Sequence, residues 1–175
     1  MKVYADNAAT TKMSKAARDV MVEYIDSYYG NPSSLYEIGQ IAAVKLMEAR
    51  ESIARCINAD AKEIYFTSGG SEADNQAILS AAEYGKKKGK KHIISTAFEH
   101  HAVLHTLKKL EREGFEVTYL DVHENGIVTA EEVDAAIKDD TVLVTIMYAN
   151  NEIGTIQPIK EIGAVCRKRG VWFHT

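Results

Sequence analysis

Apolar residues recur every three or four positions along the first part of the chain, which is the spacing of one face of an α-helix. The first such segment covers residues 14–29 and is ended by Gly30-Asn31-Pro32, a turn that a helix does not continue through. The second segment covers residues 38–57 and keeps its apolar stripe from Ile38 to Cys56. The pattern therefore predicts two consecutive helices.

From residue 64 onward, short apolar runs alternate with helical segments. The run Val-Leu-Val-Thr-Ile-Met at residues 142–147 lacks a polar residue at every second position, which is typical of a strand buried on both faces. The predicted strands are residues 64–67, 92–95, 116–120, 142–147 and 171–173, and the predicted helices between them are residues 72–84, 102–112, 130–137 and 158–169. Thr129 and Glu132 have the spacing of a capping box. This alternation predicts an α/β fold with a mostly parallel sheet and helices on both faces.

The last predicted strand, residues 171–173, falls at the end of the 175-residue chain. A sheet that ended there would present an apolar strand with unpaired backbone groups, whereas domains normally end on polar surface residues. We therefore expect the chain to be the front part of a larger folding unit.

Composition and charge exclude several classes of protein. With 46% hydrophobic and 26% charged residues the chain resembles an ordinary globular domain, and its net charge of −4 gives no general attraction to nucleic acid or anionic lipid. The basic run at residues 86–91 is expected to be a solvated helix end. No apolar run approaches the roughly 18 residues of a membrane span, and no signal peptide opens the chain. We expect a protein without nucleic-acid or membrane partners.

The two cysteines, Cys56 and Cys166, have no spacing typical of a metal site or a disulfide framework. Both fall on the apolar faces of predicted helices, where a cysteine is usually a small buried hydrophobic residue. The sequence therefore indicates a reduced, cytoplasmic compartment.

The turn Ser68-Gly69-Gly70-Ser71 lies between a predicted strand and a predicted helix. Free backbone N–H groups and the helix dipole converge at such a point, so the turn can bind an anion. It has neither the lysine of a Walker loop nor the glycine spacing of a dinucleotide fingerprint. A tight connection capped by a serine remains the alternative.

Two further polar motifs follow predicted strands, namely Glu99-His100-His101 and Asn150-Asn151-Glu152. Open α/β folds bind ligands at the carboxyl ends of their strands, so three motifs in this position indicate a ligand crevice. A helix cap for the histidine and a turn for the asparagines are the alternative interpretations. His101 and His105 are four residues apart, but no third ligand accompanies them, so no metal site is predicted.

Five stretches together resemble the cysteine desulfurases, which are fold type I pyridoxal-phosphate enzymes of the class V aminotransferase type. These stretches are residues 4–11, 30–34, 66–75, 99–104 and 150–154. The resemblance implies that the chain is the front part of the large pyridoxal-phosphate-binding domain. It implies an N-terminal arm at residues 1–13, a helical N-terminal segment at residues 14–58, and the incomplete cofactor-binding domain at residues 59–175.

The resemblance also assigns roles to single residues. Gly70 and Ser71 match the positions that hold the cofactor phosphate, although the family usually has threonine in place of this serine. His100 matches the catalytic histidine that stacks on the pyridine ring and moves protons. Asn151, rather than Asn150, matches the asparagine near the ring's phenolic oxygen. The implied cofactor is pyridoxal 5'-phosphate, and no metal is implied.

The implied activity converts L-cysteine to L-alanine and leaves the sulfur as an enzyme persulfide for iron–sulfur cluster assembly or another sulfur acceptor. The implied assembly is a homodimer, with an iron–sulfur scaffold or a sulfur-acceptor protein as a possible partner.

The family's aspartate for the pyridinium nitrogen would follow Thr175, and its Schiff-base lysine and nucleophilic cysteine lie further on. We therefore expect residues 1–175 to be inactive alone. Two alternatives remain open, a non-catalytic fragment that binds pyridoxal phosphate or dimerises, and a selenocysteine lyase or another fold type I enzyme.

Overall fold

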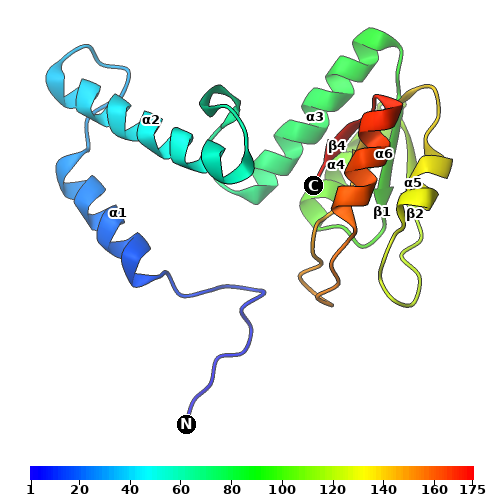
Figure 1. The fold of residues 1–175 in the computed structure, drawn as a ribbon, viewed down its shortest axis with the longest axis horizontal. Coiled ribbons are helices and arrows are strands. Elements are labelled where there is room, and N and C mark those ends of the chain that lie inside the picture. The colour runs from blue at the N-terminus through cyan, green and yellow to red at the C-terminus, as the bar shows by residue number, and fades with distance from the viewer. The chain divides into compact units, whose positions relative to one another are not determined.

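The computed structural model describes residues 1–175 and consists of two compact units, Met1–Phe66 and Thr67–Thr175 (Figure 1). The first unit contains the helices α1 (Lys15–Ser27) and α2 (Glu37–Ile57) and the short 3₁₀ helix η1 (Ala61–Glu63). Ser14 caps α1, because its side chain accepts a hydrogen bond from the N–H of Ala17 at 3.1 Å. The two helices predicted for this part of the chain are confirmed. No helix of either unit is both long enough and apolar enough to cross a membrane.

The strand predicted at residues 64–67 is wrong. This segment is extended but pairs with no strand. The N–H of Ile64 bonds to the carbonyl of Ala61 at 3.2 Å, and the carbonyl of Ile64 accepts from the guanidinium of Arg50 in α2. Arg50 also lies over the ring of Phe66, 4.9 Å from its centroid. The apolar segment therefore packs against a helix and a cation instead of joining a sheet.

The second unit alternates helices and strands, as predicted. Its helices are α3 (Gly70–Lys88), α4 (His101–Arg112), α5 (Ala130–Ala136) and α6 (Ile159–Arg169), and its strands are β1 (His92–Thr96), β2 (Glu116–Leu120), β3 (Thr141–Thr145) and β4 (Trp172–His174). Helix α3 continues four residues beyond its predicted end at residue 84 and stops at Gly89, which has a left-handed φ of 70°. The capping box of Thr129 and Glu132 is confirmed at the start of α5.

All strand pairs of the sheet are parallel, and the strand order is β2-β1-β3-β4. One core cluster joins α3 and α4 to one face of the sheet through residues such as Ile78, Leu107 and Ile93. The other joins α5 and α6 to the opposite face through Val133 and Ile162. Figure 1 shows the strands between these two helix pairs. The predicted α/β class, with a parallel sheet and helices on both faces, is confirmed.

The strand order has a switch point between β1 and β3. From β1 the chain moves outward to β2, and it then returns to the other side of β1 to form β3 and β4. The connections from the carboxyl ends of β1 and β3 therefore leave in opposite directions. In open α/β sheets, ligands bind in the crevice that opens at this point.

Candidate active site

The turn before α3 leaves backbone donors free. Glu72 accepts hydrogen bonds from both the N–H and the hydroxyl of Ser68, each at 2.6 Å, and these bonds lower the pKa of its carboxyl group. Both donors lie outside the helix, so Glu72 does not occupy the helix's own donors. The N–H groups of Gly70, Ser71 and Glu72 donate to no acceptor in the chain. The first turn of α3 therefore keeps the unpaired donors that make a helix N-terminus attractive to anions.

Neither glycine of this turn is required by the chain's own packing. A Cβ atom built on Gly69 or Gly70 would meet no other atom within 4 Å. The φ of Gly69 is 163°, which is extended backbone that any residue can adopt. What the glycines provide is open space beside the backbone of the turn that carries the free N–H groups. A phosphate could enter this space, and a side chain would fill it.

His100 lies directly after the β1 loop and caps α4. Its Nδ1 accepts a hydrogen bond from the N–H of Ala102 at 3.1 Å. An accepting Nδ1 carries no hydrogen, so in the neutral ring the hydrogen is on Nε2. The alternative interpretation of this histidine as a helix cap is thus correct as a description of Nδ1, and it leaves Nε2 for another task.

The two asparagines after β3 differ in their surroundings. Asn150 is only 6% exposed. Its Oδ1 accepts from the N–H groups of Glu152 and Ile153 at 2.8 and 3.0 Å, and its Nδ2 donates to the carbonyl of Phe98 at 3.1 Å. Asn151 is exposed, and its amide donates to the Glu152 carboxylate at 3.0 Å. Asn150 therefore builds the turn, while Asn151 presents an amide at the surface.

A cavity of about 220 Å³ lies where β1, β3 and β4 end. His100 lines it together with Glu99 from the β1 loop, Thr145 from β3, His174 from β4 and Asp74 from the beginning of α3. Through Asp74, the N-terminal part of α3 meets the β1 and β3 loops at one edge of the sheet, whereas Gly70, Ser71 and Asn151 do not line the cavity. Of the site residues that the sequence predicts, His100 alone lines this cavity, and its role stays a prediction.

Sequence reasoning missed three residues of the cavity that interact with one another. Nε2 of His174 lies 3.6 Å from the Asp74 carboxylate, and Nδ1 of His174 lies 2.9 Å from the hydroxyl of Thr145. Burial lowers the pKa of His174, and the charge of Asp74 opposes that shift. Only the position of His174 at the end of the last predicted strand could have indicated its place in the crevice.

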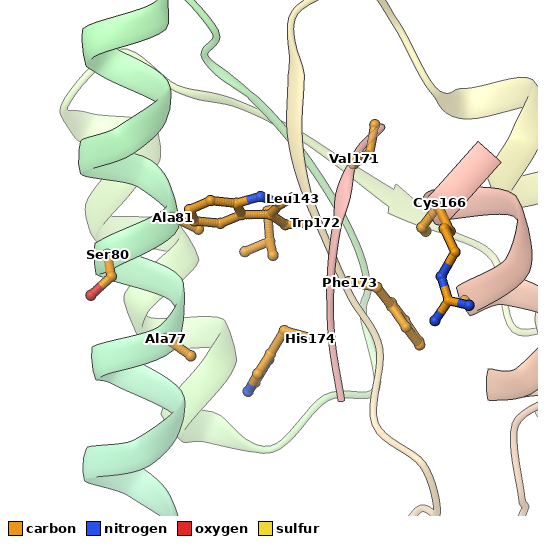
Figure 2. Close-up of a pocket in the computed structure, with 11 residues that line it drawn as sticks. Ala77, Ser80, Ala81, Leu143, Cys166, Val171, Trp172, Phe173 and His174 are labelled. Atoms are coloured by element: carbon orange, nitrogen blue, oxygen red, sulfur yellow. The ribbon is translucent and has the colours of Figure 1, made fainter. Parts of the chain in front are cut away.

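A larger cavity of about 680 Å³ lies along the free edge of β4, between α3 and α6 (Figure 2). Figure 2 shows Trp172 and His174 on the α3 side of the strand and Phe173 on the α6 side. None of the site residues predicted from the sequence lines this cavity, and its walls are mostly apolar. The larger hollow shares His174 with the cavity of about 220 Å³ but contains none of the predicted polar motifs.

The cysteines and lysines of the chain are poor candidates for covalent chemistry. Cys166 is fully buried, and burial raises the pKa of its thiol to about 11, so the thiol stays protonated at neutral pH. Cys56 is exposed on α2, which corrects the prediction that both cysteines are buried. No lysine is buried, and so none has the desolvated surroundings that activate an amine.

Comparison with known proteins defines the class first. Residues 3–175 match the family described as aminotransferase class V, and the chain belongs to this family. Within it, the chain is 52% identical over 173 residues to the cysteine desulfurase IscS of Methanosarcina thermophila and 51% identical over 174 residues to that of Clostridium botulinum. The matched region covers 99% of this chain in both cases, but only 43% and 44% of the length of those relatives. The chain thus spans less than half the length of the curated relatives it matches, in their N-terminal part.

Solved structures agree with this relationship. A NifS-like protein is similar with a TM-score of 0.93 and 39% identity, over 99% of this chain and 48% of the other. The structure described as SspA in complex with cysteine is similar with a TM-score of 0.92 and 39% identity, over 98% of this chain and 49% of the other. The resemblance to cysteine desulfurases is therefore confirmed, and so is the fold.

Proposed function

We propose that the chain forms the cofactor-binding front part of a pyridoxal-phosphate-dependent cysteine desulfurase, which converts L-cysteine to L-alanine and passes the sulfur to an acceptor. The observation that carries this proposal is the meeting of an open helix N-terminus and the β1 and β3 loops at the switch point of the sheet. The identity of about half the residues to IscS proteins supports it.

The phosphate of the cofactor would bind at the start of α3. The free N–H groups of Gly70 and Ser71, the hydroxyl of Ser71 and the helix dipole all favour an anion there. The dipole alone contributes about 0.3 to 2 kcal/mol. A hydrogen bond to a charged oxygen adds about 1.5 to 3 kcal/mol. When bound, pyridoxal phosphate withdraws electrons from the Cα atom of the amino-acid substrate.

His100 would place its imidazole against the cofactor ring and move a proton at Nε2. The bond from Ala102 to Nδ1 fixes which nitrogen carries the hydrogen and limits rotation of the ring. Imidazole is the side chain best suited to gain and lose a proton near neutral pH. His100 thereby acts as the proton carrier among the site residues that this chain supplies.

Asn151 would contribute its side-chain amide to the phenolic oxygen of the ring. The polar atoms of Asn150 are already used within the loops, whereas Asn151 has only an exposed contact to Glu152. An exposed contact of this kind is easily exchanged for a ligand. Asn151, whose amide is available, is therefore a better ligand for the ring oxygen than Asn150.

The sulfur-accepting thiolate and the lysine that anchors the cofactor would come from outside residues 1–175. The buried thiol of Cys166 does not fit the first role, and the lysines, none of which is buried, do not fit the second. We further propose that the complete protein is a cytoplasmic homodimer that delivers sulfur to an iron–sulfur scaffold or another acceptor protein. The 175-residue chain alone is then expected to be inactive.

The test is to purify the natural gene product and to record its visible absorbance band with pyridoxal phosphate and its release of alanine from L-cysteine. A cofactor band with stoichiometric alanine supports the proposal. Cofactor binding without turnover would favour a non-catalytic binding fragment. Much faster release of alanine from selenocysteine than from cysteine would favour a selenocysteine lyase. Absence of a cofactor band would overturn the proposal.

A further inference from the structure

Two side chains connect the loop after β1 with the loop after β3. The carboxylate of Glu99 accepts a hydrogen bond from the backbone N–H of Met147 at 2.8 Å. In the opposite direction, the amide of Asn150 donates to the backbone carbonyl of Phe98 at 3.1 Å. Each loop thus sends one side chain to the backbone of the other, and the pair spans the switch point of the sheet.

Both connecting residues are almost completely buried. Glu99 and Asn150 are each 6% exposed. A carboxylate is rarely buried unless it has a partner, and no cationic side chain bonds to Glu99. Burial accordingly raises its pKa, opposed by the bonds from Met147 and Thr96. The chain keeps an energetically costly group here, which requires a reason beyond filling space.

The residue that follows each of these two is a residue of the proposed site. His100 follows Glu99 and Asn151 follows Asn150, and both His100 and Asn151 are exposed. A side chain that fixes one residue also fixes the backbone of the next, because they share a planar peptide bond. In both loops a buried anchor is therefore followed directly by an exposed polar group.

We propose that Glu99 and Asn150 are positioning residues that hold His100 and Asn151 in place at the crevice. This inference rests on the proposed function, because it takes His100 and Asn151 as the groups that face the cofactor. It differs from a role for Glu99 in proton transfer, although this carboxylate also lines the cavity of about 220 Å³. A positioning carboxylate can be replaced by an amide, whereas a proton-transferring one cannot.

The test uses the natural gene product loaded with pyridoxal phosphate. In Glu99→Gln the side-chain oxygen can still accept from Met147, so we expect kcat within about 5-fold of the parent. In Glu99→Ala the bond is lost, and we expect kcat to fall about 100-fold, the usual effect of misplacing a group by about 1 Å, with KM changed much less. Glu124→Ala removes an exposed glutamate that forms no hydrogen bond and serves as the matched control.

A second measurement does not depend on turnover. Nitrogen-15 shifts of the His100 ring, recorded without cofactor, report which nitrogen carries the hydrogen. We expect hydrogen on Nε2 in the parent and in Glu99→Gln, and a mixture of both forms in Glu99→Ala. If the parent bound no pyridoxal phosphate, the proposed function would fail, but these shifts would still decide whether Glu99 holds the ring.

If Glu99→Ala does not fold, Asn150→Asp replaces it. Aspartate keeps the oxygen that accepts from Glu152 and Ile153, but it loses the donor to Phe98. We expect kcat to fall about 10-fold or more and the His100 shifts to change in the same way. Unchanged kcat and unchanged nitrogen-15 shifts in Glu99→Ala or, in its place, Asn150→Asp would overturn the inference. So would a Glu99→Gln variant as impaired as Glu99→Ala, because that result would give the carboxylate a chemical role.

Discussion

The parallel strands of the sheet have their amino ends on one side, here called the amino edge, and their carboxyl ends on the other, the carboxyl edge. Each side has a buried titratable side chain, His92 at the amino edge and Glu99 at the carboxyl edge. His92 is fully buried, and both of its ring nitrogens are hydrogen-bonded, to the hydroxyl of Thr141 at 2.7 Å and to that of Thr118 at 2.8 Å. These bonds join three neighbouring strands. Glu99 uses one oxygen for its bonds to Thr96 and Met147 and also lines an open cavity.

The comparison indicates that the buried group at the amino edge contributes to stability, whereas the groups at the carboxyl edge are available for binding and chemistry. At the amino edge all polar atoms of the buried group are satisfied, so it can only hold strands together. At the carboxyl edge the exposed polar residues Ser71, His100 and Asn151 keep donors or acceptors that a ligand could use. Changes at the amino edge should therefore alter stability, and changes at the carboxyl edge should alter binding and turnover.

The largest expected effect is at the carboxyl edge. His100→Ala in the natural, cofactor-loaded protein should lower kcat about 100- to 10,000-fold, because it removes the proposed proton carrier. His100→Asn keeps a side chain able to cap α4 but has no imidazole, and it should lower kcat equally. Urea unfolding should show little loss of stability for His100→Asn. Normal turnover in either variant would contradict the role of this histidine.

At the amino edge, His92→Ala should reverse this pattern. The variant leaves a cavity and removes the partner of two hydroxyl groups, at a cost of about 3 kcal/mol in the free energy of unfolding. Thr118→Val breaks only one of the two bonds and should cost about 1 kcal/mol. Urea denaturation measures both values. A large change in kcat without loss of stability would contradict the division between the two edges.

The cofactor phosphate offers a third test, of intermediate size. Ser71→Ala removes one hydroxyl donor and should weaken the binding of pyridoxal phosphate about 10-fold or more, which corresponds to about 1.5 kcal/mol. Ser71→Thr keeps the hydroxyl and should bind as the parent does. Titration followed by the cofactor's absorbance measures both. Equal affinity of the alanine variant would remove Ser71 from the phosphate site.

The sequence allowed the carboxyl edge to be predicted because its signals are local. The motifs around His100 and Asn151 each follow an apolar run that forms a strand, and parallel strands place such loops at one edge. The assignment of the turn at Ser68–Ser71 to the same edge rests on a strand at residues 64–67 that the structure does not contain. The strand order and the contacts that depend on it could not be predicted. The bond from His92 to Thr118 and the proximity of Asp74 and His174 exist only because distant segments pair in one register.

The wrong strand at residues 64–67 has a related cause. An apolar run shorter than eight residues fits a strand by pattern alone, and its partner decides the outcome. Here the partner is Arg50, far back in α2, whose guanidinium takes the carbonyl that a neighbouring strand would have used. The prediction that Cys56 is buried was wrong for a similar reason, since an apolar stripe on a helix does not show which part of the stripe other residues cover.

The dependence of stability on pH should also differ between the two edges. Burial lowers the pKa of His92 from its ordinary value of 6.5, with Lys138 contributing and Glu116 and Asp140 opposing. The folded state therefore prefers the neutral ring, so this stability is present above pH 6.5 and is lost as the pH falls below it. The loss cannot exceed about 1.4 kcal/mol per pH unit for one group. His92→Leu should reduce this acid-side slope in urea denaturation at a series of pH values, and an unchanged slope would contradict the assignment.

Glu99 should show the opposite sign. Burial raises its pKa above the ordinary value of 4.5, and the charge of Asp74 adds to that shift. The folded state prefers the protonated acid, so its contribution is largest below pH 4.5 and is lost as the pH rises through the folded-state pKa. Glu99→Gln removes the charge but keeps an acceptor for Met147. The variant should therefore match the parent near pH 4 and be more stable at pH 7, by a margin on the order of 1 kcal/mol. A glutamine variant that is less stable at pH 7 would mean that the bonds from Thr96 and Met147 outweigh the cost of burying the carboxylate, and the carboxyl edge would then be held together as tightly as the amino edge.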